Sequence, residues 1–319
     1  MTKSICLPRK IISLLVALSI TLLTTSRAYG QAKSVLKPAH TWLFAVGILS
    51  FQNSSETSWD SKNRRDTQLV EWAKNAGIPN DHIVYTGDAA ATKSTISQKF
   101  EEFLPKVQAG DFLIVYYTGH GAKGGFETTD GKLWEMSSIV GNIDEHCQNI
   151  HVLLLGDCCY SGSLQDAISE HEGTNEYAII SSSAKTEPGH GNWTFSEALL
   201  QALRGNPVAD SNKDGFISLE ETKNFIRSDI LTYENNHSAF ATTTPSFAQM
   251  ILTKANANAY FAPKAVEVFY HEQWWAAKQL ETNGTSAHIR WMQLGYDSPD
   301  QDEWIELSNV RALTPDALR

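Results

Sequence analysis

A histidine and a cysteine each stand just after an apolar run of this 319-residue chain. His120 follows residues 112–117 (FLIVYY) in the segment YYTGHG, and Cys159 follows residues 151–155 (HVLLL) in the segment GDCCYSG. A thiolate is a strong nucleophile, and an imidazole can take up its proton and pass it on. The two side chains therefore predict the chemistry of a cysteine hydrolase, if the fold brings them together.

Glycines around the histidine favour the same chemistry. Gly119 and Gly121 allow the chain to turn tightly around His120. Gly121 also presents a main-chain N–H that no side chain obstructs, which suits an oxyanion hole. We therefore expect Gly121 to donate to the oxyanion that forms during acyl transfer.

Strand periodicity separates the two adjacent cysteines. Side chains alternate along a strand, so Asp157 and Cys159 share one face and Cys158 points to the other. This predicts Cys158 as a core residue and Cys159 as the nucleophile, and a disulfide between Cys147 and Cys158 is conceivable. The alternative is that the free cysteines are buried and inert, as such residues commonly are.

The apolar runs belong to a longer alternation of strand-like and helix-like segments. The strand-like segments are residues 41–50, 82–85, 112–117, 151–155, 177–180 and 247–252, and the helix-like segments are residues 66–76, 92–107 and 195–203. This alternation predicts an α/β fold with a mostly parallel sheet of about six strands flanked by helices. In such a sheet, functional residues gather at the carboxyl ends of the strands.

The pattern changes after about residue 255. Short strand-like runs then follow one another with no helix between them, at residues 266–270, 274–281, 286–294 and 303–312. They predict a small all-β module at residues 256–319, after an α/β domain at residues 31–255.

Residues 1–30 have the features of a secretory signal peptide. Basic residues precede the apolar run 11–23, which is shorter than the ~20 residues that a membrane-spanning helix needs. Ala28 and Gly30 supply small residues before a cut at Gln31. We therefore expect a secreted or periplasmic protein that is not held in the membrane after cleavage, and an uncleaved anchor is the alternative.

The net charge argues against a nucleic-acid partner. The chain has 26 basic and 36 acidic residues, a formal charge of −10. Removing residues 1–30 takes away four basic and no acidic residues, which leaves 22 against 36, or −14. This is the wrong sign for a protein that binds phosphates of DNA or RNA.

Residues 210–221 match the calcium-binding loop of an EF-hand. Gly215 stands at the sharp turn, and the predicted ligands are Asp210, Asn212, Asp214, Phe216 (through its carbonyl), Ser218 and Glu221. No second hand is visible in the sequence, so we expect calcium to support a helix that starts at Ser218 rather than to act as a signal. An acidic surface loop without metal is the alternative. No organic cofactor is expected.

The segments YYTGHG and GDCCYSG resemble the two signatures of the caspase and metacaspase superfamily of cysteine endopeptidases, over about residues 38–255. The chain is also similar to bacterial caspase-like proteins and, more distantly, to legumains and gingipains. The resemblance implies a caspase-like sheet with His120 as general base and acid and Cys159 as nucleophile. It further implies that the N–H groups of Gly121 and Cys159 form the oxyanion hole.

Acidic residues near the predicted site resemble the specificity pocket of metacaspases. Asp157 stands two residues before the nucleophile, where true caspases have a glutamine, and a buried carboxylate favours a cationic side chain. Asp66 stands where metacaspases have a second pocket acid, although a helix N-cap explains it equally well. The stretch IISSSAKTE, with Ser182 and Ser183, resembles the caspase substrate cleft but lacks its arginine. These features predict cleavage after Arg or Lys.

The segments WWAAKQL and DEWIEL resemble strands of Tudor-like or chromo-barrel-like modules, which are small SH3-like barrels. Four aromatic residues could form a surface for a cation or a proline-rich peptide: Trp275, Trp291, Tyr296 and Trp304. Packing of these rings in the core of the barrel is the alternative. The ligand of the module is unknown.

These features together predict a secreted cysteine endopeptidase that acts on peptides or proteins with basic residues, depends on calcium and processes itself. A catalytically silent scaffold that binds peptide is one alternative. A legumain-like ligase or transpeptidase is another, because it would use the same acyl-enzyme.

Overall fold

The structure is a computed structural model that describes residues 34–51, 57–60, 64–189, 193–234, 236–256, 264–291 and 302–312. The predicted signal peptide and Tyr296 lie outside the described residues. Within the described residues, no helix has the length and apolar character needed to cross a bilayer.

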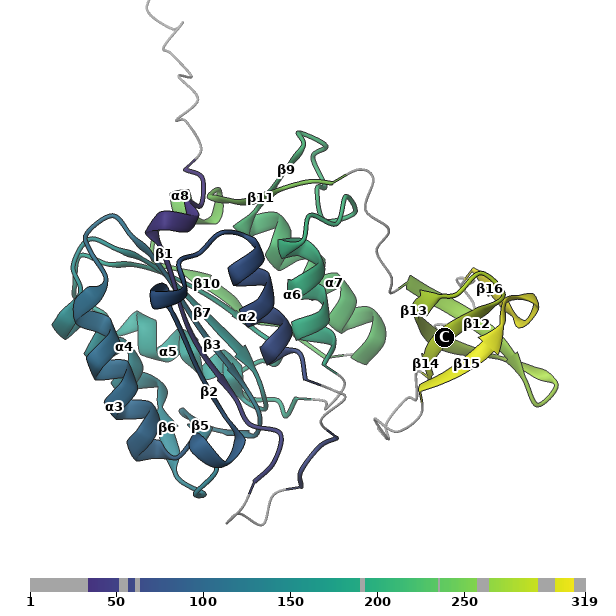
Figure 1. Ribbon diagram of the computed structural model, residues 1–319, viewed down its shortest axis with the longest axis horizontal. Coiled ribbons are helices and arrows are strands. Elements are labelled where there is room, and N and C mark those ends of the chain that lie inside the picture. Colours follow the sequence, from purple (N-terminus) through teal and green to yellow (C-terminus); the bar gives the residue numbers. More distant parts are fainter. Residues whose placement is uncertain are drawn as a thin grey trace, which may run out of the picture. The chain divides into compact units, whose positions relative to one another are not determined.

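A six-stranded sheet forms the centre of the α/β part, in the order β10-β8-β7-β3-β1-β2 (Figure 1). Its strands are β1 (Thr41–Gly47), β2 (Ile83–Gly87), β3 (Phe112–Thr118), β7 (His151–Asp157), β8 (Glu176–Ser181) and β10 (Phe240–Thr242). Five strands are parallel, and β10 pairs with β8 in antiparallel direction at the edge. The predicted mostly parallel sheet of about six strands is therefore confirmed.

Continuous apolar runs form the central strands because helices cover both faces of the sheet. All seven residues of β1 and all seven of β3 are buried. One face packs against α2 (Asp66–Asn75), α6 (Thr194–Leu203) and α7 (Leu219–Glu234). The other packs against α3 (Lys93–Phe103), α4 (Met136–His146) and α5 (Leu164–Ser169).

Several elements differ from the sequence prediction. Residues 247–252 are not a strand of the central sheet, because the short helix α8 (Pro245–Ala248) precedes β11 (Ile251–Lys254), which pairs with β9 (Phe216–Ser218). The helix α4 was not predicted. A three-stranded sheet follows His120 and consists of β4 (Gly121–Ala122), β5 (Gly125–Glu127) and β6 (Leu133–Glu135).

A separate five-stranded antiparallel sheet occupies the C-terminal part, in the order β15-β14-β13-β12-β16. Its strands are β12 (Lys264–Tyr270), β13 (Gln273–Thr282), β14 (Ser286–Trp291), β15 (Asp302–Glu306) and β16 (Val310–Ala312). The predicted strand at residues 303–312 is thus two strands with a 3-10 turn between them. A small core of Val266, Val268, Ala277, Ala287 and Ile289 holds this sheet together. The all-β character is confirmed, and the likeness to an SH3-like barrel stays a prediction.

Candidate active site

The ends of β3 and β7 bring the segments of His120 and Cys159 to the same edge of the sheet. In the parallel pairing of these strands, Thr118 lies opposite Asp157, and each stands two positions before one of the predicted catalytic residues. The N–H of Gly119 donates to the carbonyl oxygen of Asp157 across 3.3 Å. The two loops therefore leave the sheet side by side.

Gly121 makes a close approach between the two segments. A Cβ at this position would lie 2.5 Å from both the Sγ of Cys158 and the carbonyl oxygen of Cys159, so only glycine fits against this main chain. Gly119 is restricted in a different way, because its φ of +150° suits glycine. The chain around His120 can therefore pack directly on the cysteine segment.

The two adjacent cysteines have different environments. Cys158 is buried in the core on the α3–α5 side of the sheet, as strand periodicity predicted, and burial raises the pKa of its thiol well above the ordinary value. Cys159 is only half-buried, and its Sγ lies 3.8 Å from the carbonyl oxygen of Gly189. The three cysteines that the structure describes are free, so the conceivable disulfide between Cys147 and Cys158 is not formed.

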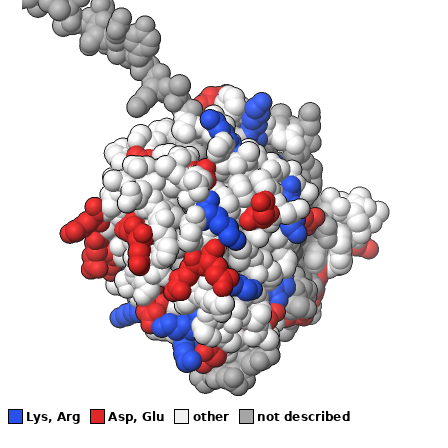
Figure 2. Space-filling model, turned by 60° about the vertical axis from the view of Figure 1, so that its left-hand side comes forward, with Lys and Arg blue, Asp and Glu red and all other residues white. Residues whose placement is uncertain are grey.

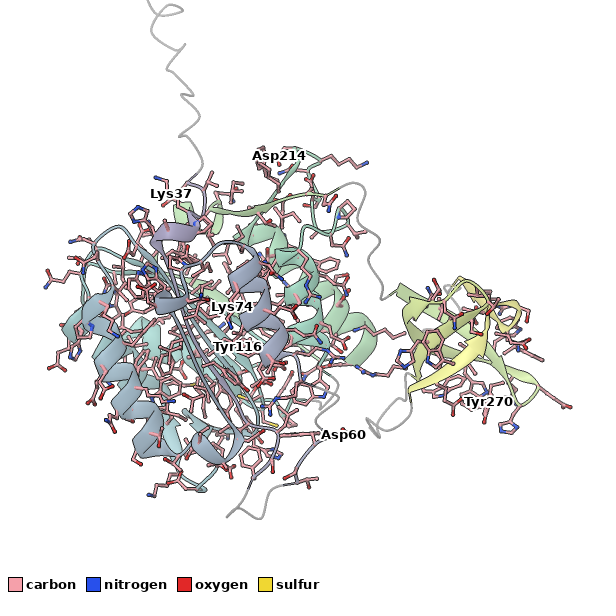
Figure 3. All side chains as sticks on the ribbon, in the orientation of Figure 1. Lys37, Asp60, Lys74, Tyr116, Asp214 and Tyr270 are labelled. Carbon is pink, nitrogen blue, oxygen red and sulfur yellow. The ribbon has the colours of Figure 1, made fainter. Side chains whose placement is uncertain are left out.

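The imidazole of His120 is surrounded by one loop that the sequence analysis missed. Its Nε2 lies 2.9 Å from the carbonyl oxygen of Thr57, and its ring centroid lies 4.3 Å from that of Trp59 and 4.9 Å from that of Phe51. Aromatic residues near the end of β1 were the only signal in the sequence. Their relation to His120 depends on how a non-periodic loop folds back, which no local pattern reveals. Figure 3 shows Asp60, in the same loop, near the ends of the parallel strands.

Ser182 and Ser183, which follow β8, form hydrogen bonds with the cysteine segment. Both are buried, and the Oγ of Ser183 donates to the carbonyl oxygen of Cys158 at 2.9 Å. The N–H of Ser182 donates to Gly156, and the carbonyl oxygen of Ser183 accepts from Gly162. These groups are therefore engaged within the chain, and direct pairing of the two serines with a substrate stays a prediction.

Asp157 lies on the face of the sheet that α2 and α6 cover. Ser196, in the first turn of α6, donates to the Asp157 carboxylate and shares a hydrogen bond of 2.6 Å with the hydroxyl of Tyr116. Burial raises the pKa of Asp157 to about 6, although the hydrogen bond from Ser196 opposes the shift. The Oγ of Thr118, opposite Asp157, is buried and has no hydrogen-bond partner among the described residues. Both side chains carry oxygen atoms that can accept a hydrogen bond.

Asp66, the second predicted pocket acid, is fully buried and has a cationic partner within the chain. Nε and Nη2 of Arg64 donate to its two oxygens at 3.1 and 2.7 Å, and the Tyr85 hydroxyl donates at 2.7 Å. Gly47 leaves room for this carboxylate, since an added Cβ would lie 1.8 Å from its Oδ2. The N-cap interpretation of Asp66 is wrong, because α2 begins at Asp66 itself and Arg65 is the N-cap.

Arg64 joins Asp66 to the ends of β1 and β2. Its Nη2 donates to the carbonyl oxygen of Gly47 at 2.9 Å, and its Nη1 pairs with Asp88, which follows β2. Burial disfavours the charge of Arg64, but hydrogen bonds to Asp66 and Asp88 outweigh this effect and raise its pKa. Asp88 also accepts from the N–H of Leu49 at 2.8 Å. The sequence analysis did not identify Arg64, although its position beside Asp66 could have suggested it.

The predicted calcium loop lies between α6 and α7. Asp210 accepts from the N–H groups of Asp214 and Gly215 at 3.1 and 2.9 Å, and Glu221 accepts from the N–H of Ser218 at 3.0 Å. Burial opposes the ionisation of Glu221, but its hydrogen bonds with Ser218 outweigh this effect and lower its pKa. No group of three or more His, Cys, Asp or Glu side chains in the described ranges is arranged to hold a metal. The calcium site therefore stays a prediction.

Among the described residues, the predicted aromatic surface is divided between the two faces of the C-terminal sheet. Trp275 and Trp291 lie on one face of the C-terminal sheet, near Tyr270, whose carbonyl accepts from Trp275 Nε1 at 3.0 Å. Trp304 pairs with His288 on the opposite face, where the two rings stack at 5.0 Å. Trp275 and Trp304 are each 49% exposed, whereas Trp291 packs against the small core of this sheet.

A model of a known protein family matches most of the α/β part of the chain. The profile of the caspase domain matches residues 74–267, a span that includes His120 and Cys159. A crystal structure of a Geobacter sulfurreducens protein is similar at a TM-score of 0.49 and 14% identity, over 68% of this chain and 99% of that chain. No relative was found among curated proteins. Since the caspase-domain match covers more than half of the sequence, the chain belongs to the caspase-domain family of cysteine peptidases.

Proposed function

We propose that this protein is a cysteine endopeptidase that cleaves after Arg or Lys through a thioester between Cys159 and the substrate. Membership of the caspase-domain family supports cysteine peptidase chemistry. The observation that carries the finer proposal is the register of β3 and β7, together with the fit of Gly121 against Cys158 and Cys159. It holds the histidine and cysteine segments against each other at one edge of the sheet.

The contacts of His120 assign roles to its two ring nitrogens. A carbonyl oxygen can only accept a hydrogen bond, so Nε2, which lies 2.9 Å from the oxygen of Thr57, carries the proton in the neutral ring. Nδ1 is then the base that takes the proton from the thiol of Cys159. We expect the resulting imidazolium and thiolate to be the reactive pair.

Acyl transfer then follows in two steps. The thiolate of Cys159 attacks the carbonyl carbon, and the N–H groups of Gly121 and Cys159 stabilise the oxyanion. Collapse breaks the C–N bond, and the leaving amine takes the proton from His120. Water attacks the thioester with His120 as base, which releases the new carboxyl group and restores the thiol.

The carboxylate of Asp157 is the proposed partner of the basic substrate side chain. It is buried at the end of β7, two residues before Cys159. The hydroxyl of Thr118, which lies opposite it in β3, is a second oxygen acceptor. A guanidinium or ammonium group would form charge-assisted hydrogen bonds there, whereas an acidic side chain would be repelled. The role of Asp66 in this pocket requires that Arg64 give way or share the carboxylate.

The direct test is a cleavage assay on purified residues 31–319. Peptides that end in Arg, Lys, Asp or Asn before a fluorogenic group should separate the specificities, and we expect the first two to be cleaved. Cys159→Ala and His120→Ala should each lower kcat by about 10³-fold or more. Cys147→Ala removes a different free thiol and should retain activity.

The other hypotheses give different results in the same assay. Preference for a peptide that ends in Asp would contradict the carboxylate pocket, and undiminished turnover by Cys159→Ala would contradict the nucleophile. A folded protein that binds but cleaves none of the peptides would be a silent scaffold. Products joined to an added amine in excess of hydrolysis would identify a ligase.

We also propose that the protein is secreted or periplasmic, since residues 1–30 have the pattern of a signal peptide, and that residues 210–221 bind calcium. All of the proposed ligands offer oxygen, which suits a hard cation: Asp210, Asn212, Asp214, the Phe216 carbonyl, Ser218 and Glu221. The buried carboxylates of Asp210 and Glu221 support this proposal.

Self-processing and the absence of a nucleic-acid partner stay predictions. On the face drawn in Figure 2, basic and acidic side chains are interspersed without a continuous basic stripe.

A further inference from the structure

The imidazole of His120 sits in a corner formed by two aromatic rings. The centroid of the Trp59 ring lies 4.3 Å from that of His120, with an angle of 30° between the planes. The Phe51 ring lies 4.9 Å from His120 and 6.2 Å from Trp59. These three distances place Trp59 and Phe51 in roughly perpendicular directions from His120, so Trp59 covers a face of the imidazole and Phe51 closes a side.

Trp59 is itself held in place. The main-chain N–H of Trp59 donates to the carbonyl oxygen of Leu49 at 2.8 Å. The indole ring lies edge-on to the ring of Trp193, with 5.6 Å between the centroids. Trp193 is only 5% exposed and stands directly before α6 with a φ of +59°. The N–H of Phe51 donates to Ser58 at 3.1 Å. Residues 57–59 thus lie beside residues 49–51 and rest on the buried ring of Trp193.

The imidazole of His120 needs a fixed orientation if one of its nitrogens is to face Cys159. The hydrogen bond between Nε2 and the oxygen of Thr57 constrains one end of the ring. An indole lying close to parallel with the imidazole opposes rotation of the ring, because rotation would drive the two rings into each other. The π face of an indole also attracts a cation, which favours the imidazolium that forms when the thiol loses its proton.

We infer that Trp59 is a positioning residue that acts through His120: its indole holds the imidazole in the orientation in which Nδ1 faces Cys159. Trp59 does not take part in proton transfer itself. The inference rests on the proposed His120–Cys159 pair, and it adds a residue that only the folded loop reveals.

Substitutions at Trp59 test this role. Trp59→Ala removes the ring, Trp59→Leu keeps apolar bulk without a π face, and Trp59→Phe keeps an aromatic face. We expect the first two to lower kcat for an Arg peptide by about tenfold with KM changed less than about twofold, and Trp59→Phe to recover most of the loss. Trp304→Ala is the matched control, since it removes an indole stacked on another histidine, His288.

A second measurement needs no substrate binding. Iodoacetamide is small and neutral, and Cys159 is the thiol it can reach among the described cysteines because Cys147 and Cys158 are buried. We expect its alkylation rate to fall in Trp59→Ala and Trp59→Leu by about the same factor as kcat, and to be near normal in Trp59→Phe and Trp304→Ala. Cys159→Ala supplies the blank, and circular dichroism checks the fold.

Three outcomes would contradict the inference. A higher KM with unchanged kcat and unchanged alkylation would make Trp59 a wall for substrate. Leucine that rescues as well as phenylalanine would exclude a role for the π face. Failure of the proposed function itself is distinguishable, because His120→Ala would then leave the alkylation rate of Cys159 unaltered. If His120→Ala slows alkylation and Trp59→Ala does not, the catalytic pair stands and the positioning role of Trp59 is wrong.

Discussion

Asp157 affects both the proposed substrate pocket and the stability of the protein, because its carboxyl group is buried. Burial raises the pKa of its carboxyl to about 6, while an ordinary Asp titrates near about 3.9. Between these two values the folded protein keeps a proton that the unfolded chain has released. The protonated group therefore supports folding fully below about pH 4, and this contribution is lost as the pH rises through about 6.

Asp157→Asn should remove this pH dependence. From about pH 4 to pH 7, the free energy of unfolding of the wild type should fall relative to that of the variant by roughly 2 kcal/mol. Urea denaturation at a series of pH values measures the difference. The cleavage of Arg peptides by the wild type should rise over the same range, since only the ionised carboxyl attracts a cation. Parallel stability curves for the two proteins would show that another group titrates.

Arg64 connects the ends of the strands β1 and β2 with the start of the helix α2. It bonds to Gly47, Asp66 and Asp88, and the Asp66 carboxylate that it neutralises is fully buried. Removing one member of a buried ion pair leaves the other charge uncompensated. The proposed specificity pocket and the loop after β1 therefore share one guanidinium.

We predict that Arg64→Ala lowers the free energy of unfolding by about 3 kcal/mol. Arg227→Ala, which removes an exposed arginine of α7, should change it by less than about 0.5 kcal/mol. If Asp66 also receives the substrate, KM for Arg peptides should fall in Arg64→Ala because the internal competitor is gone. Chemical denaturation and steady-state kinetics measure the two effects. An unfolding free energy equal to that of the wild type would contradict the proposed role of Arg64.

Elements with strong patterns were predictable from the sequence, and tertiary contacts were not. β1 and β3 are continuous apolar runs, and Thr92 caps α3 by accepting from Thr95. The run 247–252 was misassigned because a short apolar stretch does not distinguish a helix end from a strand. α4 was missed although Met136, Ile139, Val140 and Ile143 have helical spacing and are buried.

Some residues of the candidate site were predictable from the sequence and others were not. His120 and Cys159 could be predicted because each follows a strand that has a clear pattern. Thr57 and Trp59 could not, because they lie in a loop whose path depends on Leu49, Ser58 and Trp193 rather than on any periodicity. Arg64 stands two residues before Asp66 in the sequence, but its simultaneous bonds to Gly47 and Asp88 depend on how β1, β2 and α2 meet.

At the scale of the whole molecule, the proposed calcium loop and the candidate active site lie at opposite ends of the α/β part. Figure 3 shows Asp214 at one end and Asp60 near the carboxyl ends of the parallel strands. β9 lies within the loop and pairs with β11, and β11 contacts Val35 and Leu36 just before β1. A cation in this loop would therefore hold α7 and the amino-terminal edge of the sheet together, without contact with His120.

We therefore predict that calcium stabilises the protein and leaves its specificity unchanged. A ligand that binds only the folded state at about 100 times its Kd adds about 2.7 kcal/mol, which corresponds to several degrees in Tm. Thermal unfolding in millimolar calcium and in a chelator measures the shift, which Asp210→Asn and Glu221→Gln should abolish. Glu172→Gln, at an exposed acid elsewhere, should retain it. Equal Tm values with calcium and with chelator would exclude the site, and a loss of cleavage without a change in Tm would place the calcium effect in the active site instead.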